Sequence, residues 1–130
     1  MKNLKKVLAL VLVVAMMASF AVSAGAASFT DNAKIVYNDA VKLLSNLDVI
    51  NGFTDGSFNP EGNVTRAQTA KMIAYIMNGG EDASSTFAAS AKFNDVANGY
   101  WAANSIGYCA TKEIVAGAGN NLYYPNNDVT

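Results

Sequence analysis

The sequence of 130 residues contains no histidine, one cysteine, two prolines and one arginine. The lack of histidine excludes nucleophile–histidine pairs and imidazole general bases. Cys109 cannot form a disulfide framework alone, and zinc sites built from cysteine and histidine are excluded by the same counts. A mildly acidic mature chain with a single arginine is a poor candidate for nucleic acid, which requires several cations to neutralise its phosphates. No spacing supports an acid–base pair of Lys, Asp or Glu, so we predict no catalytic residue, no cofactor and no metal site.

The first residues have the order of a secretory signal peptide. Three lysines precede an almost unbroken apolar run over residues 7–17, and small residues follow it. Cleavage is expected after Ala24 or Ala26, which makes residues 1–26 the predicted signal peptide. A transmembrane anchor is the alternative, but the run is shorter than the roughly 20 residues of a spanning helix. We therefore expect an exported protein with no membrane span after cleavage.

The mature chain is small and mildly acidic. The whole sequence has 9 basic and 10 acidic residues. Three of the basic residues belong to the signal peptide, so six remain against ten acidic ones and the mature net charge is −4. A chain of this length can form one small domain or two subdomains.

An internal repeat organises the mature chain. Landmarks of the first half return in the second half at an offset of 64 or 65 positions. Ordered matches at a nearly constant offset indicate two copies of one structural unit. The matched pairs are Asp31 and Asp95, Gly52 and Gly117, Phe58 and Tyr123, Pro60 and Pro125, and Thr65 and Thr130.

Each copy is expected to begin with a helix. Asp31 and Asp95 lie where their carboxylates can accept hydrogen bonds from the unpaired amides of a helix N-terminus. Apolar residues at helical spacing over 36–47 and 102–110 predict one buried stripe on each helix. Cys109 lies on the second stripe, so we interpret it as a buried core residue and not as a reactive thiol.

A second helix is predicted to start at Thr65. Thr65 and Gln68 have the spacing of a capping box, in which each side chain accepts a hydrogen bond from the backbone amide of the other residue. Residues 53–64, rich in turn residues, form the loop before this helix. Because Thr130 matches Thr65, the second copy is predicted to stop before its second helix.

The second copy would then present an unpaired helix face. Ile106 and Cys109 lie on that face, and exposed apolar surface of this kind is expected to cause self-association. The predicted organisation is a signal peptide over 1–26, a first repeat over 27–78, a linker over 79–92 and a truncated second repeat over 93–130.

The ordered motifs resemble the S-layer homology repeat. They are Phe-x-Asp, a helix, Gly, Asp-Gly-x-Phe-x-Pro and Val-Thr-Arg-Ala-Gln, and their two copies cover nearly the whole mature chain. The resemblance implies a mainly α fold of helix–loop–helix repeats, packed here as an incomplete pseudo-threefold helical bundle. It also implies a non-covalent anchoring module that binds a secondary cell-wall glycopolymer, often pyruvylated, in grooves between repeats. We therefore expect a secreted bacterial protein at the cell wall or in the S-layer, with S-layer co-assembly as a further expectation.

The resemblance implies a set of polymer-binding residues. Arg66 follows the cap threonine and corresponds to the family's main ligand contact. Trp101 corresponds to the tryptophan early in the repeat, and it can either stack on a sugar ring or fill the core. Gly52, Asp55 and Gly56 complete the candidate set.

Arg66 also has a physical argument. Its predicted place is the first turn of a capped helix, beside unpaired amides and the positive end of the helix dipole. There a guanidinium can bind a carboxylate or phosphate through two hydrogen bonds, and a solvated surface arginine is the alternative. Gln68 stands where the family usually has glutamate, which keeps the capping box and removes a charge.

A second class of function remains open. The repeats could be the targeting end of a longer exported enzyme, such as a wall hydrolase, whose catalytic part follows Thr130. Further repeats after this position would favour an anchoring module. A long segment with paired acids or a nucleophile would favour the enzyme.

Overall fold

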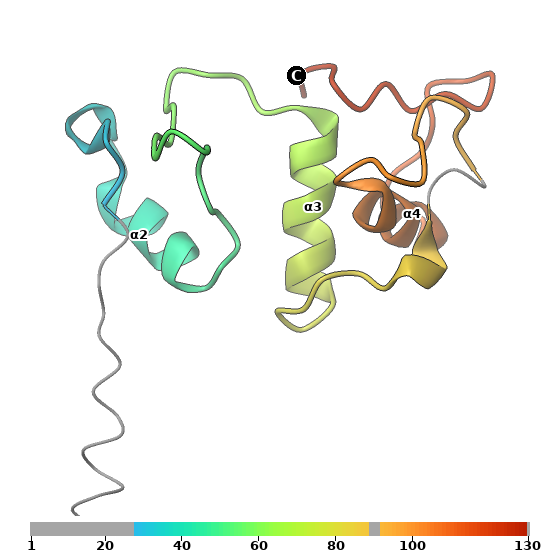
Figure 1. Cartoon of the computed structure of the whole chain (residues 1–130), viewed down its shortest axis with the longest axis horizontal. Helices are drawn as coiled ribbons and strands as arrows, with labels where there is room; N and C mark the ends of the chain where they lie inside the picture. Colours follow the sequence, from blue (N-terminus) through green and yellow to red (C-terminus); the bar gives the residue numbers. More distant parts are fainter. Residues whose placement is uncertain (1–27, 89–91, 130) are drawn as a thin grey trace, which may run out of the picture.

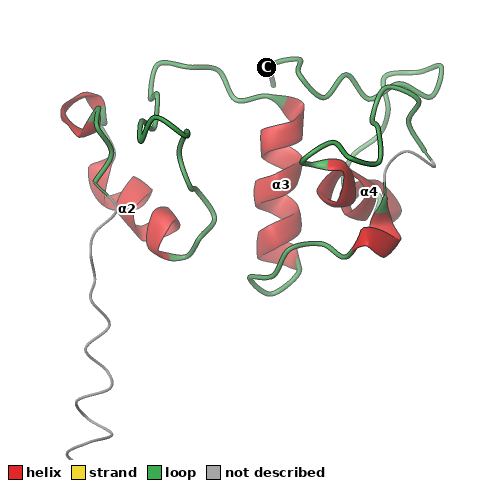
Figure 2. Ribbon diagram, viewed as in Figure 1, coloured by secondary structure: helices red, strands yellow, loops and turns green. Residues whose placement is uncertain are grey.

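The chain folds into short helices joined by long loops. The computed structural model describes residues 28–88 and 92–129, so the predicted signal peptide lies outside the described residues. Figure 2 shows helices and loops and no strand in this part of the chain, which confirms the mainly α prediction. The helices are η1 over Asn32–Lys34, α2 over Asn38–Asn46, α3 over Arg66–Met77, η2 over Ser85–Phe87 and α4 over Ala103–Thr111.

The start of α3 is fixed by its own first residues. The Gln68 amide donates a hydrogen bond to the Thr65 hydroxyl at 3.3 Å, and the Thr65 amide donates to the Gln68 side-chain oxygen at 2.8 Å. The capping box expected from the spacing is therefore present. It satisfies amides that have no partner within the helix itself.

α3 packs against α4, the first helix of the second copy. Figure 1 places these two helices side by side, whereas α2 lies in a separate lobe. Ala67, Ala70 and Ala74 line the buried face of α3, and their small side chains let α4 approach closely. Ile106 and Cys109 of α4 are completely buried in the same cluster. The prediction that Cys109 is a core residue is confirmed.

This helix pair corrects the prediction of an unpaired face on the second copy. The expected exposure of Ile106 and Cys109 is wrong, because the second helix of the first copy covers them. The larger core therefore takes α3 from the first copy, and α4 with its loop from the second. The two helices that pack together, α3 and α4, therefore come from different copies of the sequence repeat. The pseudo-threefold bundle and the repeat boundaries stay predictions.

The first copy has a smaller core of its own, made of Phe29, Ile35 and Val41. The stripe expected to be buried on its first helix is largely exposed. The exposed fraction is 85% for Val36 and 60% for Leu43. That prediction is wrong because no described helix lies over α2 as α3 lies over α4 (Figure 1).

Asp31 and Asp95 hold loops and do not cap helices. Asp31 precedes η1 without a side-chain cap bond. Its carboxylate accepts hydrogen bonds from the amides of Phe58 at 2.9 Å and Asn59 at 2.7 Å. Asp95 accepts at 2.8 and 2.7 Å from residues 123–124, the matching amides of the second copy. The expected N-cap role is wrong, because the partner amides lie across the loop and not in the following turn.

Candidate functional site

Arg66 joins the start of α3 to the loop of the second copy. Its Nε donates a hydrogen bond to the Tyr123 carbonyl oxygen at 2.9 Å, and its Nη2 donates to the Ala116 carbonyl oxygen at 3.0 Å. The guanidinium carbon lies 4.5 Å from the centre of the Tyr123 ring, a distance suited to a cation–π contact. Tyr123 in turn donates its hydroxyl to the Arg66 carbonyl oxygen at 3.1 Å. The arginine is therefore held in one orientation and is not a freely solvated side chain.

The backbone amides beside the Arg66 side chain are occupied. The Arg66 amide donates to the Asn127 carbonyl oxygen at 2.8 Å, and the Ala67 amide donates to the Pro125 carbonyl oxygen at 2.9 Å. The expectation of unpaired amides at this helix N-terminus is wrong, because the second-copy loop covers it. What the site can still offer an anion is the Nη1 group of Arg66, which lies outside these hydrogen bonds.

Trp101 lies on the surface, in the turn that precedes α4. Its exposed fraction is 57%, so the alternative that it fills the core is wrong. The Tyr100 ring lies 5.7 Å away, centre to centre, and the Tyr100 hydroxyl donates to the Asn126 side-chain oxygen at 3.0 Å. This hydrogen bond fixes the aromatic pair against the second-copy loop. Beside the polar second-copy loop, the two rings therefore leave apolar surface exposed to solvent.

Gly52, Asp55 and Gly56 belong to a tight turn in the first-copy loop. Gly52 has a φ of +69°, and a Cβ atom there would lie 2.5 Å from the Phe29 ring. The Asp55 carboxylate accepts hydrogen bonds from the hydroxyl and the amide of Ser57 at 2.7 and 3.0 Å. These two bonds, the hydroxyl first, hold the pKa of Asp55 below its usual value. The three residues therefore shape the loop, and Asp55 also lines a shallow hollow beside it.

The candidate residues fall into two groups. Arg66 and Trp101 flank the second-copy loop, whereas Gly52, Asp55 and Gly56 lie in the first-copy loop. Within the part of the chain that the structure describes, no hydrogen bond or ring contact joins the two groups.

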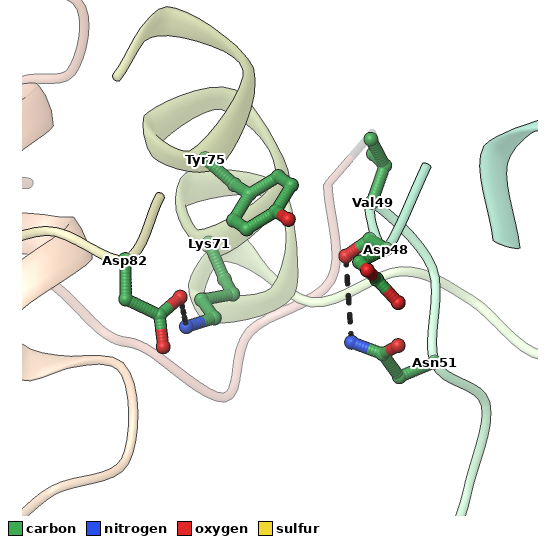
Figure 3. A pocket seen from close by; sticks show the side chains of 6 residues that line it. All are labelled: Asp48, Val49, Asn51, Lys71, Tyr75 and Asp82. Atoms are coloured by element: carbon green, nitrogen blue, oxygen red, sulfur yellow. Dashed lines mark hydrogen bonds and ion pairs between the residues drawn. The ribbon is translucent and has the colours of Figure 1, made fainter. Parts of the chain in front are cut away.

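A polar hollow lies between the first-copy lobe and α3. It encloses about 310 Å³. Tyr75 of α3 points toward the turn that follows α2, and Lys71 below it forms an ion pair with Asp82 (Figure 3). The lining residues are Asp48, Val49, Asn51, Lys71, Tyr75 and Asp82.

Sequence reasoning missed Tyr123 and Lys71 as candidate site residues. The sequence contained a sign that Tyr123 is a structural anchor, because it matches Phe58 in the repeat and follows the Gly117 turn. Lys71 had none, because a lysine on a helix is usually solvated. The hollow exists only because α3 lies beside the first-copy lobe, and periodicity within one helix does not contain that information.

Three other kinds of site were considered among the described residues: a thiol nucleophile, a metal site and a membrane-spanning helix. Burial raises the pKa of the Cys109 thiol, which disfavours the thiolate that a nucleophile requires. Within residues 28–88 and 92–129, no three His, Cys, Asp or Glu residues form a group that could hold a metal ion. Over the same ranges, every helix is too short or too polar to cross a membrane.

The repeat and the helical fold agree with one protein family. Residues 28–70 and 92–130 match the S-layer homology domain family, so the chain belongs to that family. The two matched ranges fall on the two copies of the internal repeat and confirm the resemblance. Membership also confirms the predicted location at the cell surface or cell wall.

Relatives of the chain include surface proteins and enzymes. It is 35% identical to a cell surface protein of Thermoanaerobacter kivui over 99% of this chain and 17% of that protein. It is 34% identical to exoglucanase XynX of Acetivibrio thermocellus over 71% of this chain and 8% of that enzyme. With the cellulosome-anchoring protein of Acetivibrio thermocellus it shares 30% identity over 62% of this chain and 18% of that protein. The chain thus spans less than a fifth of each of these relatives, and no solved structure matches it.

Proposed function

We propose that this chain is a non-covalent anchoring module that holds an exported protein on the cell wall by binding a secondary cell-wall glycopolymer. Membership of the S-layer homology domain family is the observation that carries the proposal. Two relatives, named as a cell surface protein and a cellulosome-anchoring protein, support an anchoring role. Because the mature part is acidic, it would meet an acidic polymer through local cationic contacts and not through its net charge.

Arg66 is the proposed contact for an acidic group of the polymer, such as a pyruvyl carboxylate. Carbonyl oxygens of Tyr123 and Ala116 accept from its Nε and Nη2, which fixes the guanidinium plane. The Nη1 group then remains for a carboxylate, and its direction is set before the ligand arrives. Preorganisation of this kind reduces the entropy that binding costs.

Neutral parts of the polymer are assigned to Trp101 and to the first-copy turn. Trp101 offers an exposed ring face for a sugar. Gly52, Asp55 and Gly56 would contribute the first-copy loop, where Asp55 lines a shallow hollow. Lys71 lies in the polar hollow between that lobe and α3, where it could meet a second acidic group by exchanging its pairing with Asp82.

The experiment is a pull-down of the secreted mature chain with purified cell-wall sacculi, intact and after chemical removal of the polymer. We expect binding to intact walls and its loss on stripped walls, and equal binding to both would contradict the proposed partner. Trp101→Ala should weaken binding to intact walls. Tyr37→Ala, which removes another exposed aromatic ring, is the matched control and should bind as the unaltered chain does.

Variants of Arg66 need a folding control, because the side chain also holds the second-copy loop. Arg66→Lys keeps the charge and loses the planar fork. Loss of one charge-assisted hydrogen bond costs roughly 1.5–3 kcal/mol, so binding should weaken by about tenfold or more. The urea midpoint of each variant is measured in parallel, so that unfolded protein is not counted as lost affinity.

A second candidate function is the targeting of a longer exported enzyme. Two relatives are named exoglucanase XynX and amylopullulanase, and the matches cover 8% and 5% of their lengths. A small targeting module on a large enzyme fits those proportions. The coding sequence after Thr130 separates the two functions. Further repeats would favour a dedicated anchor, and a long segment with paired acids would favour the enzyme.

A further inference from the structure

We propose that Asn51 is a site of spontaneous modification, at which the side-chain amide becomes a carboxylate through a cyclic imide shared with Gly52. The reaction is fastest where glycine follows asparagine, and the chain contains three such pairs, which begin at Asn51, Asn78 and Asn98. The structure distinguishes Asn51 from Asn78, because the fold leaves the first pair free to react and holds the second. The product carries a new negative charge in the polar hollow next to α3.

The reaction joins two atoms of neighbouring residues. The backbone nitrogen of Gly52 gives its proton to a base in the solvent and attacks Cγ of the Asn51 side chain. The new N–Cγ bond closes a five-membered imide, and the Cγ–Nδ2 bond breaks and releases ammonia, which takes up a proton. Water then opens the imide at one of its two C–N bonds, which yields aspartate or isoaspartate. Either product is ionised at neutral pH.

The Asn51–Gly52 pair is held by few contacts. Both residues are exposed, so water and base can reach them. Among residues 28–88 and 92–129, the Asn51 side chain makes one hydrogen bond, from Nδ2 to the Asp48 carbonyl oxygen (Figure 3), and its 3.4 Å length exceeds that of a typical N–H···O bond. Within the same ranges, neither the Asn51 amide nor the Gly52 amide donates a hydrogen bond. The attacking nitrogen can therefore approach Cγ without losing a backbone hydrogen bond.

Asn78, by contrast, is half-buried at the end of α3 and held by its neighbours. Its side-chain nitrogen donates to the Glu81 and Asp82 carbonyl oxygens at 3.1 and 3.3 Å. The Gly79 amide, whose nitrogen would have to attack, donates to the Ile76 carbonyl oxygen at 3.3 Å. Closing the imide here would break these bonds, so the folded chain should protect Asn78.

The fold requires the glycine of the reactive pair but not the asparagine. Gly52 has a φ of +69°, and a Cβ atom there would lie 2.7 Å from the Ser57 carbonyl oxygen. A side chain that would slow the attack therefore cannot be accommodated at position 52. Position 51 carries no such demand, because the second copy has Ala116 in the corresponding place. Reactivity at Asn51 can thus be removed without disturbing the loop.

The product would change the hollow between the first-copy lobe and α3. Asn51 lines this hollow together with Asp48, Lys71 and Asp82. A carboxylate at position 51 would add to the charge of Asp48 and offer Lys71 a second acidic partner. The hollow would then attract an acidic wall polymer less strongly, and this consequence alone rests on the proposed function.

The test is a timed incubation of the secreted mature chain at mildly alkaline pH, folded and in urea. Trypsin then releases peptide 43–66 with Asn51 and peptide 72–92 with Asn78, and mass spectrometry measures the conversion of asparagine to its acid in each. Asn98 falls in a different peptide and does not enter the comparison. In the folded chain Asn51 is expected to convert at least several times faster than Asn78. In urea both should convert at similar rates, because glycine follows each.

Asn51→Ala is the control variant. It should fold as the unaltered chain does by circular dichroism, and its peptide 43–66 should keep its mass throughout the incubation. Equal rates at Asn51 and Asn78 in the folded chain would overturn the proposal, as would conversion of Asn51 in urea only. The same mass change in the Asn51→Ala peptide would assign the reaction to another residue and overturn it as well. No wall polymer enters the experiment, so its failure would not bear on the proposed anchoring function.

Discussion

Asp31 and Asp95 each close a loop with one carboxylate. The Phe58 amide is the main cause that lowers the pKa of Asp31, and the Asn59 amide adds to it against the opposing effect of burial. For Asp95, burial is the largest influence and raises the pKa, but the amides of Tyr123 and Tyr124 together outweigh it. Both carboxyl groups are therefore more acidic in the folded chain than in the unfolded chain.

Stability is expected to fall in acid as a consequence. The folded pKa of both carboxyl groups lies below the unfolded value of 3.8, so folding favours the charged form. The stabilisation is present above about pH 4 and disappears as the pH falls through the lower folded pKa. Urea unfolding should give a constant midpoint between about pH 5 and 7 and a falling midpoint below about pH 4.

Asp95→Asn is the control for this pH dependence. The amide side chain keeps the size of aspartate but offers one acceptor where two amides need one each. The free energy of unfolding should drop by roughly 1 kcal/mol at neutral pH, and the further loss in acid should be smaller than in the unaltered chain. An acid dependence identical to that of the unaltered chain would exclude a contribution from this carboxylate.

At the scale of the element, α3 links the two copies because its faces serve different neighbours. Its N-terminus is held by the second-copy loop, and its alanine face packs on α4. Lys71 and Tyr75, beside the alanine face on α3, line the polar hollow next to the first-copy lobe. Close approach to α4 depends on Ala70, which is completely buried and whose carbonyl oxygen accepts from the Cys109 thiol at 3.5 Å.

Ala70→Leu should separate α3 from α4. Extra side-chain volume in a packed contact costs about 1–3 kcal/mol, and the loss is measured as a lower urea midpoint. Ala40→Leu makes the same change on the exposed face of α2, where a shift within about 0.5 kcal/mol is expected. Equal effects at the two sites would contradict the assignment of α3 to α4.

Features with a local cause could be predicted from the sequence. Thr65 and Gln68 are three positions apart, so their reciprocal hydrogen bonds follow from spacing alone. The apolar stripe that contains Cys109 follows from spacing in the same way, whereas the burial of that stripe depends on α3.

Features whose partner is distant in the chain could not be predicted in this way. The amides that Asp31 binds are 27 and 28 positions away. Helical periodicity identifies an apolar face, but it does not identify the helix that covers the face. The spacing predicted that Arg66 lies in the first turn of α3. It did not predict the second-copy loop that accepts hydrogen bonds from the neighbouring amides, because that loop is distant in the chain.

At the scale of the whole molecule, the proposed polymer site needs both copies. Arg66 belongs to the first copy, yet its orientation is set by carbonyl oxygens of the second. Trp101 comes from the second copy and is fixed to the same loop through Tyr100. Neither copy alone would hold these two side chains in place, so polymer binding should depend on the folded pair.

Trp101 is the only tryptophan in the sequence, so its fluorescence reports on one surface. The most direct measurement is a titration of the secreted mature chain with purified wall glycopolymer, followed by tryptophan emission. A saturable change in emission is predicted with the native polymer, and no change with polymer whose acidic substituents have been removed. An unchanged emission throughout the titration, or the same change with both polymers, would contradict the binding of an acidic wall polymer at this site.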